Sequence, residues 1–163
     1  MDVKTDHTHE LSAEKQVQFL YNKLIDSWNK QNANEYASLF TSDGNVIGFD
    51  GSQANGQEEI HSQLSEVFNH HKTAAYVSMV REIRPLDPIV WLLRAVAGMV
   101  PPGQSDINPA VNVIQTLIAV KVHDDFKIVL FQNTPAQFHG RPDLADQLTK
   151  ELRTVLHNSK ISK

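Results

Sequence analysis

The stretch of residues 40–60, FTSDGNVIGFDGSQANGQEEI, constrains the fold of this chain more than any other part of the sequence. Turn-forming residues come first, an apolar and β-prone segment follows at 46–49, and Gly51 and Gly56 then bracket a polar loop. A helix is predicted to begin near Gln57, because a cap residue precedes it and two glutamates follow in its first turn. A short strand between two helices favours a fold that combines helices with a sheet.

The composition describes one globular domain. The chain has 163 residues, of which 40% are hydrophobic and 21% charged, which is enough for a single core. The net charge of −4 gives no electrostatic signature of a nucleic-acid partner or of an acidic membrane surface. We therefore expect neither of these as a partner.

The absence of cysteine excludes several kinds of site. Without a thiol there is no disulfide, no cysteine nucleophile and no thiolate metal ligand. The N-terminal residues are polar and lack the apolar segment of a signal peptide, so we expect a cytoplasmic protein. The longest apolar run, 89–100, contains Arg94 and is too short to span a bilayer, so it is interpreted as a buried strand.

The first half of the chain is predicted to be helical around the short strand. Residues 1–11 are expected to form a flexible polar arm, in which the His7 and His9 pair is a weak indication of metal binding. Apolar residues at helical spacing predict a long helix at 12–31 with Ser12 as its N-cap, then a short helix that carries Tyr36 and Phe40. The third helix is predicted at 57–70.

The second half is predicted to be a sheet followed by a helix. Segments 74–84, 89–100, 111–123 and 127–134 are separated by turns and predict an antiparallel meander, which 46–49 joins after a helical crossover. Two of these strands are apolar on both faces, so helices should cover one face and a second subunit the other. Apolar spacing after Gly140 predicts a final helix.

This pattern resembles the nuclear transport factor 2-like (cystatin-like) superfamily, and within it the SnoaL-like group of the SgcJ/EcaC type. The resemblance covers about residues 14–134 and is carried by Trp28, the YASLFTSDG run at 36–44, Gly51, Gly56 and the FQNT run at 131–134. It implies an α+β fold in which N-terminal helices pack on a strongly curved antiparallel sheet, forming a cone with a central pocket. The expected divisions are an arm at 1–11, the cone at 12–136 and a C-terminal helical extension at 137–163.

The resemblance implies a homodimer through the outer sheet face, but not one activity, because the superfamily includes isomerases, cyclases, dehydratases, hydrolases and binding modules. Its ketosteroid-isomerase-like members use a carboxylate base on the first strand, and Gly48 stands at that position here. Asp50 could replace it if its side chain turned into the cone. An Asp before Gly at the end of a strand is more often a turn residue.

Further candidates have functional and structural interpretations. His61 could be an acid or base at the mouth of the pocket, or a surface histidine. Arg94 needs a partner, for which Glu82 across the first hairpin is available. Gln132 and Asn133 point to opposite faces of the last strand, so one of them enters the cone. The expected apolar wall consists of Trp28, Tyr36, Phe40 and Phe68.

Three functions fit the sequence. The first is a dimeric module that binds a small, mainly apolar ligand without chemistry, and the missing carboxylate favours it. The second is an enzyme without a cofactor that uses Asp50 or His61 for proton transfer. The third is an oligomerisation or docking domain whose cone is filled by its own side chains. We expect no metal and no cofactor.

Overall fold

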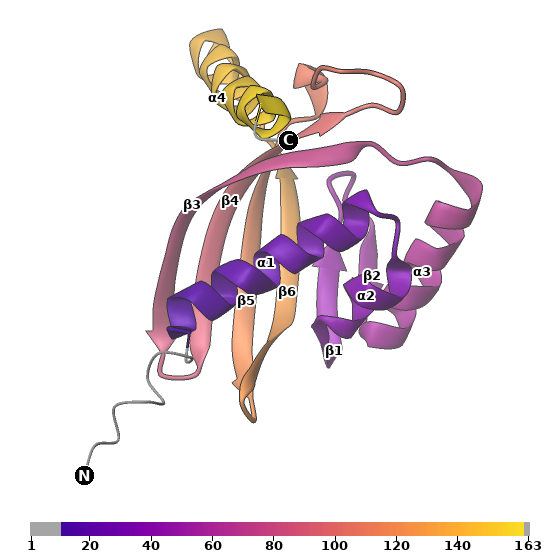
Figure 1. Ribbon diagram of the computed structural model, residues 1–163, viewed down its shortest axis with the longest axis vertical. Helices are drawn as coiled ribbons and strands as arrows, with labels where there is room; N and C mark the ends of the chain where they lie inside the picture. The colour runs from indigo at the N-terminus through magenta and orange to yellow at the C-terminus, as the bar shows by residue number, and fades with distance from the viewer. Residues whose placement is uncertain (1–10, 162–163) are drawn as a thin grey trace.

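The computed structural model describes residues 11–161, in which four α-helices and one six-stranded sheet form an α+β fold (Figure 1). The predicted arm at 1–11, with His7 and His9, lies outside the described residues except for Leu11. The helices are α1 (Ala13–Asn29), α2 (Ala33–Ser38), α3 (Gln57–His70) and α4 (Pro142–Ile161), with a short 3-10 helix η1 (Pro109–Val111). The strands are β1 (Phe40–Ile47), β2 (Gln53–Asn55), β3 (Ala75–Asp87), β4 (Val90–Val100), β5 (Val113–Val122) and β6 (Asp125–Pro135).

The sheet has the strand order β2-β1-β6-β5-β4-β3 and is mixed. Strands β3 to β6 form the predicted antiparallel meander, and β2 pairs antiparallel with β1. Strand β1 runs parallel to β6, so the expectation of an entirely antiparallel sheet is corrected at this pair. The reason is topological, because the two strands lie far apart in the sequence and the meander between them brings β6 back in the direction of β1.

The predicted loop between Gly51 and Gly56 contains the short strand β2, and the two largest differences in strand boundaries are in β1 and β3. Strand β1 begins at Phe40 rather than 46, because the turn-forming residues 42–44 lie within a strand with a register shift. Gly44 is needed there, since a Cβ at this position would lie 2.8 Å from the carbonyl oxygen of Ile128. Strand β3 continues through Pro85, which is tolerated because β3 is an edge strand.

Local capping explains where the first three helices begin. The Ser12 hydroxyl caps α1 by accepting a hydrogen bond from the Lys15 amide at 3.2 Å. Asn32 caps α2 in the same way, because its side-chain oxygen accepts from the Glu35 amide at 3.0 Å. Helix α3 begins directly after Gly56, whose positive φ of 92° a side chain would disfavour. The signals at Ser12 and Gly56 are local, which is why the sequence predicted these two helix starts.

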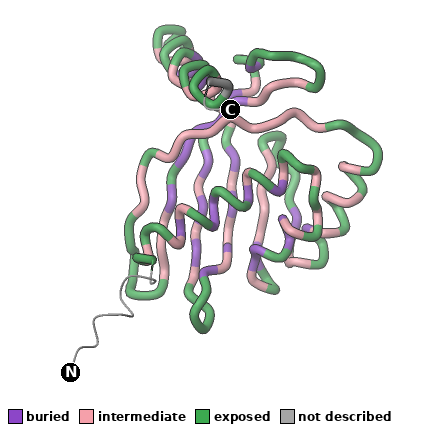
Figure 2. The backbone as a smooth tube through the Cα atoms, viewed as in Figure 1, coloured by how far each residue is buried: buried purple, intermediate pink, exposed green. Residues whose placement is uncertain are grey.

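Helix α1 lies across the concave face of the sheet, while α2 and α3 close the side that carries β1 and β2 (Figure 1). The core between α1 and the sheet follows from alternation, since every second residue of the central strands faces the helix. Figure 2 shows this buried layer along the strands. Its members include Val17, Leu20 and Leu24 from α1, Leu93 and Ala95 from β4, and Leu117 and Ala119 from β5.

A buried chain of hydrogen bonds crosses this apolar layer. The Tyr21 hydroxyl on α1 donates to Gln115 Oε1 on β5 at 2.5 Å. Gln115 Nε2 then donates to Asn133 Oδ1 on β6 at 3.0 Å, and Asn133 Nδ2 donates to the Ile47 carbonyl oxygen on β1 at 3.1 Å. Each polar side chain of this series therefore has a partner, and one helix is connected to three strands.

The C-terminal end of α1 is fixed to the start of β3. Trp28 Nε1 donates to the Ala74 carbonyl oxygen at 2.9 Å. Asn29 forms a two-way clamp with Tyr76, accepting from its amide at 2.8 Å and donating to its carbonyl oxygen at 3.1 Å. Because β3 is an edge strand, the amide side chain supplies hydrogen bonds that no neighbouring strand provides on that side.

Helix α4 packs on the opposite, outer face of β3 and β4. Leu148 and Leu152 of α4 are buried against Val96 of β4 and Ile107 of the following loop. Two exposed arginine–carboxylate pairs border this contact, Arg81 with Glu151 at 2.8 Å and Arg153 with Asp106 at 3.0 Å. Exposed pairs of this kind add little stability, so the leucines hold the helix in place.

The rest of the outer face is not covered by α4. Arg94 lies there with Glu82, its expected partner, at an Nη1 to Oε2 distance of 2.9 Å. Ile114 and Val122 are 38% and 40% exposed, although β-branched side chains of a central strand are usually well covered. The other partly exposed apolar residues of this face include Ile47, Val90, Leu92, Ile118, Val120 and Leu130.

Replacing Gln115 by Leu should lower the free energy of unfolding by about 1–3 kcal/mol for each partner left unpaired, here the Tyr21 hydroxyl and Asn133 Oδ1. Urea denaturation measures this loss. The matched control is Gln104→Leu, which makes the same change at an exposed loop position and should alter stability by less than about 0.5 kcal/mol. Equal stability of the two variants would contradict the structural role of the buried chain.

Candidate functional site

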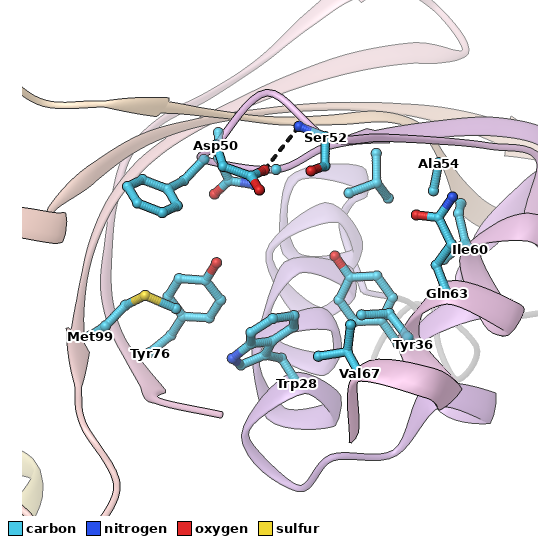
Figure 3. Close-up of a pocket in the computed structure, with 15 residues that line it drawn as sticks. Trp28, Tyr36, Asp50, Ser52, Ala54, Ile60, Gln63, Val67, Tyr76 and Met99 are labelled. Atoms are coloured by element: carbon cyan, nitrogen blue, oxygen red, sulfur yellow. Dashed lines mark hydrogen bonds between the residues drawn. The ribbon is translucent and has the colours of Figure 1, made fainter. Parts of the chain in front are cut away.

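A cavity of about 300 Å³ lies at the end of the cone where α1, α2 and α3 meet β1, β2 and β3. Its volume is at the lower end of the range for small-molecule sites. Most of its lining is apolar (Figure 3). The lining residues are Trp28, Tyr36, Val46, Gly48, Phe49, Asp50, Ser52, Ala54, Ile60, Gln63, Leu64, Val67, Tyr76, Met99 and Asn133.

Three aromatic residues form one side of the cavity. The Trp28 ring lies between Tyr36 and Tyr76, with centroid distances of 6.4 Å and 5.4 Å. Phe68 packs edge-on against Trp28 at 5.4 Å, and Phe40 stacks on Tyr36 at 5.6 Å. These contacts restrict the orientations of the three lining rings, because each ring packs against another aromatic side chain in a preferred geometry.

The hydroxyl groups of Tyr36 and Tyr76 point into the cavity, toward the turn that carries Asp50 and Ser52 (Figure 3). Within the described part of the chain, neither hydroxyl forms a hydrogen bond. Burial raises the pKa of Tyr76 to about 12, and burial together with the nearby Tyr76 raises the pKa of Tyr36 well above its ordinary value. Both phenols are therefore protonated and available as hydrogen-bond donors.

The polar groups of Trp28, Asn133 and Gln63 in the wall already have hydrogen-bond partners. The Trp28 ring N–H donates to the Ala74 carbonyl, and both ends of the Asn133 amide belong to the buried chain. Gln63 Nε2 donates to Glu59 Oε1 at 2.9 Å. Apart from the exposed Ser52 beside Asp50 at the rim, the free side-chain donors of the described lining are the hydroxyls of the two tyrosines.

The turn between β1 and β2 forms the mouth of the cavity. Asp50 Oδ1 accepts a hydrogen bond from the Ser52 amide at 2.9 Å, and Gly51 adopts a positive φ of 91°. This bond lowers the pKa of Asp50, whose side chain is exposed at the rim. Phe49 is 40% exposed beside it. The arrangement matches the turn role of Asp50 and makes its carboxylate a weak base.

Four residues expected at the pocket lie elsewhere. His61 is outside, on the surface between α2 and α3, with Nε2 at 3.5 Å from the Ser65 hydroxyl. Phe40 at the start of β1 and Phe68 on α3 do not line the cavity and pack against the lining rings of Tyr36 and Trp28. Gln132 pairs with Thr116 on the outer sheet face, since strand alternation sends it opposite to Asn133.

Of the expected residues, Trp28, Tyr36, Asp50 and Asn133 line the cavity. Strands β3 and β4 also contribute to the wall, above all with Tyr76 and Met99, which were not predicted from the sequence. A signal was present for Tyr76, because alternation along β3 places it on the same face as Ser78 and Val80, which faces α1. A strand near 74–84 in a curved sheet was expected, but the sequence does not show that the start of this strand borders the cavity.

No group of three or more His, Asp or Glu side chains within residues 11–161 is arranged to hold a metal ion. Among the described helices, none combines the length and the hydropathy needed to cross a membrane. The sequence matches no protein-family model and no curated protein. Similarity to known proteins is found at the level of structure.

The structure is similar to a domain of unknown function with a cystatin-like fold from Nostoc punctiforme, with a TM-score of 0.73 and 19% identity over 94% of this chain and all of that one. A nuclear transport factor 2-like protein of unknown function from Shewanella oneidensis has a TM-score of 0.61 and 15% identity, covering 74% of this chain and 97% of its own. This chain has a nuclear transport factor 2-like fold. The predicted cone of helices on a curved sheet is confirmed.

A third similar structure is that of a ketosteroid isomerase-like protein from Erwinia carotovora atroseptica. Its TM-score is 0.61 at 10% identity, over 78% of this chain and 99% of that one. At such identities the similarity is one of fold, which does not determine an activity. Function must therefore be argued from the cavity itself.

All three tyrosines of the chain should resist ionisation in the folded protein, because burial raises the pKa of Tyr21, Tyr36 and Tyr76. At about pH 10, where an unfolded tyrosine is half ionised, ultraviolet absorbance should show almost no tyrosinate until guanidinium is added. Stability is fully present below the unfolded pKa and is lost as pH rises toward about 12, the folded pKa of Tyr76. Native titration near pH 10 would contradict a closed aromatic wall.

Proposed function

We propose that this protein is a homodimeric, cytoplasmic member of the SnoaL-like group that binds a small, mainly apolar ligand in the cone. The observation that carries the proposal is the cavity of about 300 Å³, whose apolar walls surround two phenol donors without protein partners. Ligand sites typically combine an apolar lining with a few polar groups that fix orientation. A cone that served only for docking would be filled by its own side chains.

The alternative is an enzyme that works without a cofactor, and the likeness to a ketosteroid isomerase-like protein is consistent with it. Proton transfer near neutral pH requires a group whose pKa is close to neutrality and which reaches the ligand. Asp50 is exposed at the rim with a lowered pKa, and His61 lies outside the cavity. Binding without chemistry is therefore the better supported function.

Binding is testable with naphthalene as a probe and Trp28 as the reporter, because this ring lies in the cavity wall. The second tryptophan, Trp91, is replaced by Phe so that fluorescence reports on the cavity alone. Naphthalene should quench Trp28 in a saturable manner. Native mass spectrometry of protein purified from its own host should also detect a retained small molecule, and failure of both experiments would overturn the proposal.

Filling the cavity should abolish binding. Ala54 of β2 lines the wall, so Ala54→Phe places a ring in the space that the ligand would occupy and should weaken naphthalene binding at least about tenfold. The matched control is Ala110→Phe in η1, an exposed position remote from the lining. Unchanged affinity of the Ala54 variant, with its fold intact by circular dichroism, would show that naphthalene binds elsewhere.

The homodimer is proposed through the part of the outer sheet face that α4 leaves uncovered. Its half-exposed apolar residues on β4, β5 and β6 form one continuous surface, which a second copy could cover. Ile118→Asp at its centre should convert the dimer to a monomer in sedimentation velocity. The control Leu86→Asp replaces another exposed aliphatic residue, at the β3–β4 hairpin, and should leave the dimer intact. A wild-type monomer would overturn this part of the proposal.

A further inference from the structure

The chemistry of the proposed ligand follows from the donors that the cavity leaves unused. Tyr36 and Tyr76 flank the same Trp28 ring, and their hydroxyls point into the same space (Figure 3). Neither has a hydrogen-bond partner in residues 11–161. Both hydroxyls are accessible from the cavity, so a ligand that supplies an acceptor can form hydrogen bonds with them.

The charge of the lining restricts which acceptor fits. Of the fifteen residues that line the cavity, none is Lys, Arg or His. The single charged group is Asp50 at the rim, which its bond from Ser52 keeps ionised. An anionic ligand would lose its hydration without meeting a cation, and it would also be repelled by Asp50. The acceptor should therefore be neutral.

The shape of the wall favours a flat apolar body next to this acceptor. Trp28 presents its ring between the two tyrosines, while Leu64, Val67 and Met99 supply aliphatic and sulfur contacts. Aromatic ligands pack well against such a combination of rings and methionine. A carbonyl oxygen has two lone pairs, so it can accept from two phenols at once.

We propose that the cavity selects a neutral aromatic carbonyl compound, whose oxygen accepts hydrogen bonds from Tyr36 and Tyr76 while its ring packs beside Trp28. The inference rests on the proposed function and names its ligand class. The two tyrosines are specificity-determining residues in this assignment. Each can be replaced by Phe without breaking an internal hydrogen bond of the described chain, so the variants should fold.

The test compares naphthalene with acetylnaphthalene and naphthoate, two substituted naphthalenes of nearly equal size, by quenching of Trp28 in the Trp91→Phe protein. Acetylnaphthalene should bind about tenfold more tightly than naphthalene, because its carbonyl gains two hydrogen bonds. Naphthoate should bind most weakly. Tyr36→Phe and Tyr76→Phe should each reduce the affinity for acetylnaphthalene several-fold and leave naphthalene unchanged, and the double variant should bind both equally.

The outcomes separate this inference from the proposed function. Equal binding of naphthalene and acetylnaphthalene overturns the carbonyl assignment and leaves the apolar site in place, whereas absence of binding by every probe overturns both. Tightest binding of naphthoate contradicts a neutral ligand. An equal loss for naphthalene and acetylnaphthalene in the Tyr variants would mean that the phenols act only by shaping the wall, which also overturns the assignment.

An infrared measurement tests the hydrogen bonds directly and does not depend on the variants folding. The carbonyl stretch of acetylnaphthalene should move to lower frequency in the wild-type complex than in hexane, because two phenol donors polarise the bond. In a Tyr→Phe variant that folds, part of this shift should disappear. A wild-type stretch equal to that in hexane would overturn the proposal.

Discussion

The buried hydrogen-bonded chain from Tyr21 through Gln115 and Asn133 to the Ile47 carbonyl is the constraint on which the rest of this structure depends. Apolar packing between α1 and the sheet is strong but tolerates sliding, since many registers bury similar areas. Polar groups in the same layer allow far less sliding of the helix, because each must keep its hydrogen-bond partner in an interior without water. These buried hydrogen bonds therefore fix the position at which α1 crosses the sheet, and they join β1 to the meander.

The cavity follows from this placement. Near Tyr21, large aliphatic side chains fill the space between α1 and the central strands. Farther along, the bonds of Trp28 and Asn29 hold the end of α1 against the start of β3, and the short side chains Gly48 and Ala54 line the opposite wall. Movement of the rings into the gap would separate them from Phe40 and Phe68, which pack against them from behind. Space remains because its borders are rigid.

Much of the fold was predictable because its signals are local. The start of α3 after Gly56 and the N-cap at Ser12 depend on neighbouring residues alone, and both were located correctly. Alternation along the strands also separated Asn133 from Gln132, without indicating which face is concave. The continuation of β3 through Pro85 was not predictable, because it depends on β3 lying at the edge of the sheet.

By itself, the sequence determined the order of helices and strands and which residues must be removed from water, since capping, spacing and side-chain polarity are properties of short segments. The tertiary structure decided which of those residues surround a cavity. Tyr36 was an expected wall residue and Tyr76 was not, yet they are equivalent in the site. Their two hydroxyls share one cavity only because α2 and the start of β3, far apart in the chain, are packed on either side of Trp28.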